Sequence, residues 1–191
     1  MFAKGRNMMQ AHIDETAIVL ERLLFEVPQQ IEVAFQSLEQ KISNEAMAVA
    51  EDDSAVFHSI QSTLFEYSRI DDKTIMLNQF DQSMVILVNS FYETSLSRVV
   101  KENKIPLKVG KGKSKVIQNI DSIRIYLEKP SPYGDIEQKI KNEFSKIRNE
   151  IVHTEYSLEM NVTSEFIVQN LKNIRQVLRY YADALDEYAK K

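Results

Sequence analysis

The chain contains no cysteine and only four glycines and four prolines in 191 residues. The absence of cysteine excludes a disulfide framework and a thiolate metal site. Because glycine and proline punctuate secondary structure, their scarcity predicts long uninterrupted helices. No apolar run approaches the roughly 20 residues that a membrane-spanning helix needs, and residues 1–10 lack the apolar core of a secretory signal. We therefore expect a cytoplasmic protein that does not span a membrane.

Metal-ligand patterns are scarce too. The three histidines, His12, His58 and His153, show no ligand spacing with one another. We accordingly predict no metal and no other cofactor, and we interpret His12 and His58 as ordinary surface residues.

What the chain does have suits a compact helical domain. Hydrophobic residues make up 43% of it, enough for a core, and charged residues 27%. The length fits one domain with a helical extension. We predict an N-terminal extension over residues 1–70 and a helical bundle over residues 71–191.

Apolar residues recur at helical spacing nearly throughout, and no strand pattern stands out. Residues 84–88 are apolar on every face, which places them at the centre of a bundle. A buried strand is the other reading of this short run, but the spacing of Phe80, Met84, Leu87 and Phe91 favours a helix. Pro28 is expected to interrupt a helix or to start the next one. The fold class is all-α, with helices predicted at about 9–27, 29–50, 54–68, 71–103, 115–128, 135–153 and 163–189.

Charge is divided unevenly along the chain. Residues 1–100 carry 7 Lys/Arg and 15 Asp/Glu, a net of −8, whereas residues 101–191 carry 17 and 13, a net of +4. Six lysines fall between residues 101 and 115, and this density could neutralise phosphates of an RNA strand. A solvated loop between helices is the alternative. The candidate RNA-binding residues are Lys108, Lys111, Lys113 and Lys115.

The segment 136–153 forms an amphipathic helix that ends in a pair of chemically active residues. Its apolar residues lie at 136, 140, 144, 147 and 151, spaced four, four, three and four, as one stripe of an α-helix requires. Arg148, Asn149, Val152 and His153 fall on the opposite side of the helical wheel. The reactive side chains therefore face away from the helix's own core.

An arginine and a histidine are the minimal pair of side chains for cleaving RNA without a metal. A guanidinium holds phosphate oxygens through its planar fork of donors, and an imidazole carries protons near neutral pH. On the wheel, Asn149 and His153 lie one turn apart, while Arg148 lies about 140° from His153. One straight helix does not easily bring the side chains of Arg148 and His153 onto the same phosphate. Two copies of the helix that face each other across a two-fold axis could do so. The apolar Val152 within this outward face suits such a homodimer.

The segment Ile147-Arg148-Asn149-Glu150-Ile151-Val152-His153 resembles the signature of the HEPN superfamily: arginine, a polar residue, several more residues and histidine. A second segment, Phe91-Tyr92-Glu93-Thr94-Ser95-Leu96, resembles the aromatic-x-Glu-x-x-Leu pattern on an earlier helix of many bacterial members. The similarity covers roughly residues 75–185. It implies a four- or five-helix bundle that dimerises so that two Arg–His motifs line one cleft.

The resemblance also implies a function. Many HEPN members are metal-independent RNA endonucleases of toxin–antitoxin and antiphage systems, and others are inactive binding modules. Arg148, Asn149 and His153 are then the expected catalytic residues, and Glu93 orients a motif residue such as the arginine. The expected partners are RNA, a second copy of the chain, and an antitoxin or defence-complex protein. Relatives paired with a nucleotidyltransferase antitoxin carry a tyrosine two residues after the histidine, whereas Tyr156 stands three after it.

Three alternatives remain open. The domain could be a catalytically silent HEPN-like module for dimerisation or partner binding. It could also be a helical scaffold whose acidic N-terminal helices pair with another chain. A nucleotide-binding regulator has little support, because the sequence has no Gly-rich phosphate loop.

Overall fold

The structure is a computed structural model that describes residues 3–50, 54–68, 72–108, 110, 113–154 and 162–190. Every regular element in these residues is helical, which confirms the all-α fold class. No helix in the described part of the chain is both long and apolar enough to cross a membrane. The elements are α1 (Ala3–Ala50), α2 (Ser54–Ser68), α3 (Asp72–Glu102), α4 (Lys115–Leu127), α5 (Gly134–Lys139), the π-helical turn η1 (Ile140–Phe144), α6 (Ser145–His153) and α7 (Ser164–Tyr188).

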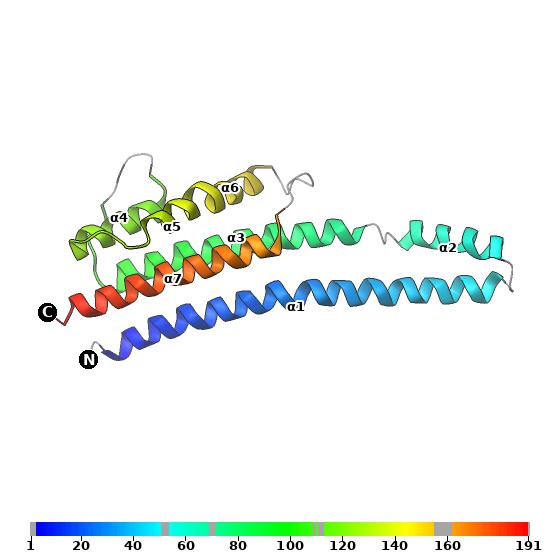
Figure 1. The fold of residues 1–191 in the computed structure, drawn as a ribbon, viewed down its shortest axis with the longest axis horizontal. Coiled ribbons are helices and arrows are strands. Elements are labelled where there is room, and N and C mark those ends of the chain that lie inside the picture. The colour runs from blue at the N-terminus through cyan, green and yellow to red at the C-terminus, as the bar shows by residue number, and fades with distance from the viewer. Residues whose placement is uncertain are drawn as a thin grey trace.

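Figure 1 shows α1 running the whole length of the molecule, with the two termini at the same end. The N-terminal part of α1 packs against α3 and α7, the last part of α1 pairs with α2, and Glu32 between them forms an ion pair with Lys73 of α3. The α4, α5 and α6 helices form a further layer over α3 and α7. The molecule thus consists of a helical body and a two-helix arm, which we define as residues 33–50 of α1 together with α2.

The body has one continuous hydrophobic core. It includes fully buried residues from every long helix of the body, among them Ile13, Leu96, Ile123, Phe144 and Leu171. The first turns of α1 contribute to this same core. In the arm, by contrast, the buried apolar residues among those whose burial is described are Ile42, Ala46 and Ala50, which do not join the core of the body.

Two expectations from the sequence are wrong. Pro28 lies inside α1 and does not divide it, so one helix of 48 residues replaces the two that were predicted. Proline costs a helix interior about 3 kcal/mol, but α1 is held on both sides of Pro28 by packing against other helices. Leu87, within the stretch expected to be buried on every face, is 49% exposed.

Most other predicted helices are confirmed. The α3 helix spans Asp72–Glu102, and α4 begins after the Ser114 cap, whose hydroxyl accepts the Ile117 N–H. Thr163 caps α7 in the same way, accepting the Phe166 N–H at 3.2 Å. These caps satisfy backbone donors that a helix start leaves unpaired. The break predicted at residues 51–53 and Tyr156 lie outside the described residues.

Candidate functional site

A pocket of about 540 Å³ opens between α3, α4 and the segment from α5 to α6. The α3 helix supplies Asn89, Tyr92 and Glu93 to its lining, and residues 113–124 supply the opposite wall. Several residues between Gly134 and Asn149 complete the lining. Three segments far apart in the sequence therefore meet around one cavity.

Arg148 and Asn149 both line this pocket, as their shared place in the motif suggests. Arg148 is half-buried, and its Nη1 donates to Asn149 Oδ1 at 3.0 Å. Its Nε is buried and has no hydrogen-bond partner among the described residues. The guanidinium is therefore fixed by its neighbour while one of its donors stays available for an acceptor from outside the chain.

His153 lies elsewhere. It occupies the last turn of α6, is exposed, and does not line the pocket. No hydrogen bond joins it to Asn149 in the described part of the chain, and the side-chain oxygen Oδ1 of Asn149 accepts from Arg148. Beside it, the apolar Val152 is 46% exposed. The structure thus brings two of the three predicted catalytic residues to one pocket and leaves the third at an open surface.

A π-helical turn precedes the motif. In η1 the Ser145 N–H reaches back five residues to the Ile140 carbonyl, which widens the helix locally. Ile140 and Phe144, four residues apart, lie at the two ends of this turn and are both fully buried. The predicted apolar stripe is confirmed. The extra residue in the π-turn, however, rotates the positions that follow it, including Arg148, relative to those of a continuous α-helix. Ser145 Oγ donates to the buried Asn89 Oδ1 at 3.1 Å, which ties the start of α6 to α3.

A buried polar network forms part of the pocket wall. The Glu137 carboxylate, 6% exposed, accepts from Arg124 Nη2 through one oxygen and from the Tyr181 hydroxyl at 2.9 Å through the other. Burial and the negative charge of Glu137 raise the pKa of Tyr181. Arg124 and Glu137 line the pocket, while Tyr181 supports them from α7. A buried charge with its partners in place holds this wall in one arrangement.

Tyr92 differs from Tyr181 in its surroundings. It is 1% exposed and lines the pocket, but its hydroxyl has no hydrogen-bond partner among the described residues. Burial raises its pKa well above the usual value, and the charge of Glu137 adds to the effect. The hydroxyl is therefore a protonated donor with no acceptor among the residues that the structure describes.

Glu93 is half-buried and shares the pocket lining with Arg148, but no ion pair joins the two in the described structure. The predicted role of Glu93 in orienting Arg148 is therefore not supported by a direct ion pair between them. The residue before it, Tyr92, is the more deeply placed member of the same sequence segment.

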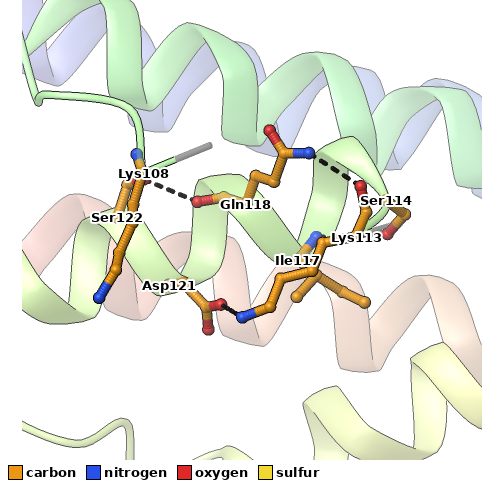
Figure 2. Close-up of polar contacts among 7 residues, drawn as sticks. All are labelled: Lys108, Lys113, Ser114, Ile117, Gln118, Asp121 and Ser122. Carbon is orange, nitrogen blue, oxygen red and sulfur yellow. Dashed lines mark hydrogen bonds and ion pairs between the residues drawn. The ribbon is translucent and has the colours of Figure 1, made fainter. Parts of the chain in front are cut away.

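The lysine-rich loop folds back on α4, as Figure 2 shows. Lys113 Nζ pairs with Asp121 at 2.6 Å, and the Lys108 backbone N–H donates to Ser122 Oγ at 2.8 Å. Gln118 donates to the Lys113 carbonyl oxygen at 2.8 Å. Lys113 and Lys115 line the pocket, Lys108 is exposed outside it, and Lys111 is not among the described residues. Two of the four predicted lysines are therefore at the site, Lys113 just before α4 and Lys115 at its first position.

Sequence reasoning missed the polar network of Arg124, Glu137 and Tyr181. The signal in the sequence is faint: Glu137 is a charged residue next to the apolar stripe of its helix, close enough to the core to need a partner. No pattern in the sequence indicates that α4 and α7 supply the partners, Arg124 and Tyr181.

No group of three or more His, Asp or Glu side chains in the described residues is arranged to hold a metal ion. Comparisons with protein-family models, with curated proteins and with solved structures give no match to this chain.

Proposed function

We propose that this protein is a HEPN-like, metal-independent RNA endonuclease that acts as a toxin or antiphage-defence effector. One observation carries the proposal: Arg148 is held in the wall of a pocket with an unpaired donor, while His153 stands exposed at the end of the same helix. An anion-binding end and a proton-transferring end are the two functions that RNA transesterification needs.

In the proposed reaction the ribose 2′-oxygen attacks the adjacent phosphorus and the bond from phosphorus to the 5′-oxygen breaks. His153 takes the 2′-hydroxyl proton or delivers a proton to the leaving 5′-oxygen. Arg148 stabilises the extra negative charge on the pentacovalent phosphorane, and Asn149 keeps its guanidinium in place. The products carry a 2′,3′-cyclic phosphate and a 5′-hydroxyl.

The proposal includes a homodimer. Arg148 and His153 lie on different sides of α6, so a second copy docking around the exposed Val152 would complete the cleft with its own arginine and histidine. An antitoxin or a defence-complex protein remains a proposed further partner.

The test is induced expression of wild type, Arg148→Ala and His153→Ala in a bacterial host, with growth and total RNA integrity read together. Growth arrest with RNA fragmentation, lost in both variants, supports the nuclease. Purified wild type should cut RNA in the presence of EDTA and leave cyclic phosphate ends. Cleavage that needs an added divalent ion, or that survives in His153→Ala, contradicts the mechanism.

A second function is favoured by the arm. Val33 and Met47, 64% and 62% exposed, lie on one side of α1 in the arm, which suits a scaffold that binds another protein through the arm. In that case Val33→Glu together with Met47→Glu would abolish the biological effect, and Arg148→Ala would leave it intact. The nuclease proposal expects Arg148→Ala to abolish it.

A further inference from the structure

The pocket beside the motif contains hydrogen-bond donors that the chain does not satisfy. Tyr92 Oη, Arg124 Nε and Arg148 Nε are buried, have no partner among the described residues, and belong to residues of the same pocket lining. A buried donor without an acceptor is costly and uncommon in folded proteins. Three of them around one cavity indicate a ligand rich in acceptors.

The charge of the lining specifies the sign of that ligand. Five basic residues (Lys113, Lys115, Arg124, Lys141 and Arg148) and three acidic residues (Glu93, Asp121 and Glu137) line the pocket, a net of +2 in a chain whose net charge is −4. Asp121 and Glu137 are already paired, with Lys113 and Arg124. The remaining charges are three cations and one anion, so the pocket favours an anion.

The start of α4 adds backbone donors to the same wall. Ser114, Lys115 and Val116 line the pocket at the N-terminus of this 13-residue helix. The first N–H groups of a helix lack intrahelical partners and favour negative charge. The Ser114 cap accepts the Ile117 N–H, which leaves those of Lys115 and Val116 unpaired within the described part of the chain.

From these observations we propose that the pocket binds a phosphate monoester, either free phosphate or the terminal phosphate of an RNA strand. Tyr92, Arg124 and Arg148 donate to its oxygens, and Lys115 supplies charge from the α4 side. The lining includes the buried residues Asn89, Tyr92 and Glu137, and the phosphate bound there is a terminal group, separate from the internal phosphodiester that the proposed reaction cleaves. Both Glu137 oxygens are occupied by Arg124 and Tyr181.

This inference goes beyond the proposed cleavage reaction and does not rest on it. Tyr92 and Lys115 are not part of the proposed catalytic set, and binding of phosphate can be measured in a protein that cuts no RNA. If the expression test shows no nuclease but phosphate binds, the proposed function fails and the pocket assignment stands. If the expression test shows a nuclease but phosphate does not bind, the pocket assignment fails and the proposed function stands.

The experiment is calorimetric titration of inorganic phosphate into the full-length protein, wild type and variants. Tyr92→Phe removes only a hydroxyl that has no partner, so the fold should be kept, as circular dichroism can verify. We expect Tyr92→Phe and Lys115→Gln each to weaken binding about tenfold. Tyr126→Phe is the matched control, because Tyr126 packs in a tilted arrangement against Tyr188 and does not line the pocket. It should bind phosphate as wild type does.

Two outcomes overturn the proposal: no saturable binding by the wild type, or equal affinity of the wild type and Tyr92→Phe. A competition arm then distinguishes the sources of the phosphate. An RNA dinucleotide with a 5′-phosphate and the same dinucleotide without it are each added to the phosphate complex. Displacement by the phosphorylated form alone supports the pocket and assigns it to an RNA end. Displacement by neither supports a site for the free ion.

Discussion

The two ends of the segment Gly134–His153 differ in almost every physical respect. Its first part, through Arg148, is built into the pocket wall, with Glu137 buried in a network and Ser145 tied to α3. Its last turn carries the exposed His153 and the exposed Val152. A motif that reads as one unit in the sequence is thus divided between a packed cavity and an open surface.

This difference separates two tasks. The packed end holds donors in fixed positions, which is what binding and electrostatic stabilisation of an anion need. The open end carries the exposed imidazole of His153, which does not line the pocket and to which we assign proton transfer in the proposed reaction. We therefore expect substitutions at the packed end to change stability and binding, and at Arg148 also activity, whereas substitution of His153 at the open end should change activity alone.

The largest expected effect concerns RNA cleavage, and it tests whether His153 of one subunit acts together with Arg148 of the other. We expect Arg148→Ala and His153→Ala each to lower RNA cleavage by about 10²- to 10⁴-fold. Mixing the two variants under conditions that exchange subunits should restore about a quarter of the wild-type rate, since half of the dimers are mixed and each has one intact pair of two. Cleavage rates of the mixture against each variant alone are the measurement.

Mixing that restores nothing would contradict a site shared in this way between subunits. The control is a mixture of each variant with itself after the same exchange treatment. His153→Ala should also unfold at the same denaturant midpoint as wild type, because an exposed side chain without close partners contributes within about 0.5 kcal/mol.

At the packed end, Glu137→Ala should lower the free energy of unfolding by about 2–3 kcal/mol. The substitution leaves the Tyr181 hydroxyl and the Arg124 guanidinium without their acceptor, and Arg124 is partly exposed, which reduces the loss. Urea denaturation is the measurement, with Glu128→Ala at an exposed position as the control. A variant as stable as wild type would show that the network does not hold the wall.

The sequence predicted the helices well because their determinants are local. Spacings of three and four among apolar residues, together with caps such as Ser114 and Thr163, act within a few residues of one another. Pro28 was misjudged because its local preference is outweighed by packing of α1 against helices that follow much later in the chain. The π-turn was missed because a spacing of four suits either kind of helical turn.

The site was predictable only in part, for the same reason. Arg148, Asn149 and two lysines were selected from motif and charge, and they do share one pocket. Tyr92 lay inside a quoted motif, but its burial beside Glu137 depends on how α3 meets α5. Arg124 and Tyr181 belong to the network through α4 and α7, and no pattern along the chain specifies that meeting.

The two buried tyrosines sharpen the comparison within the packed end. Tyr181→Phe removes a hydrogen bond to a carboxylate and should lower the free energy of unfolding by about 1.5 kcal/mol. Tyr92→Phe removes an unpaired hydroxyl and should raise it by up to about 1 kcal/mol in phosphate-free buffer. Thermal or urea denaturation of both variants gives the signs. Equal destabilisation by both would mean that Tyr92 has a partner after all.

The smallest expected effect is a pH dependence of the same two residues. Burial raises the pKa of Tyr92 and Tyr181 in the folded protein above the unfolded value near 10, so the folded state favours the neutral phenols. Their contribution to stability is full below pH 10 and is lost as pH rises toward the folded pKa. Between pH 9.5 and 10.5 each tyrosine should cost about 0.7 kcal/mol of unfolding free energy. Tyr92→Phe should therefore lose less stability than wild type over this interval, while the difference between them stays constant below pH 9. Parallel curves for the two proteins up to pH 10.5 would show that the Tyr92 phenol titrates as freely in the fold as in the unfolded chain.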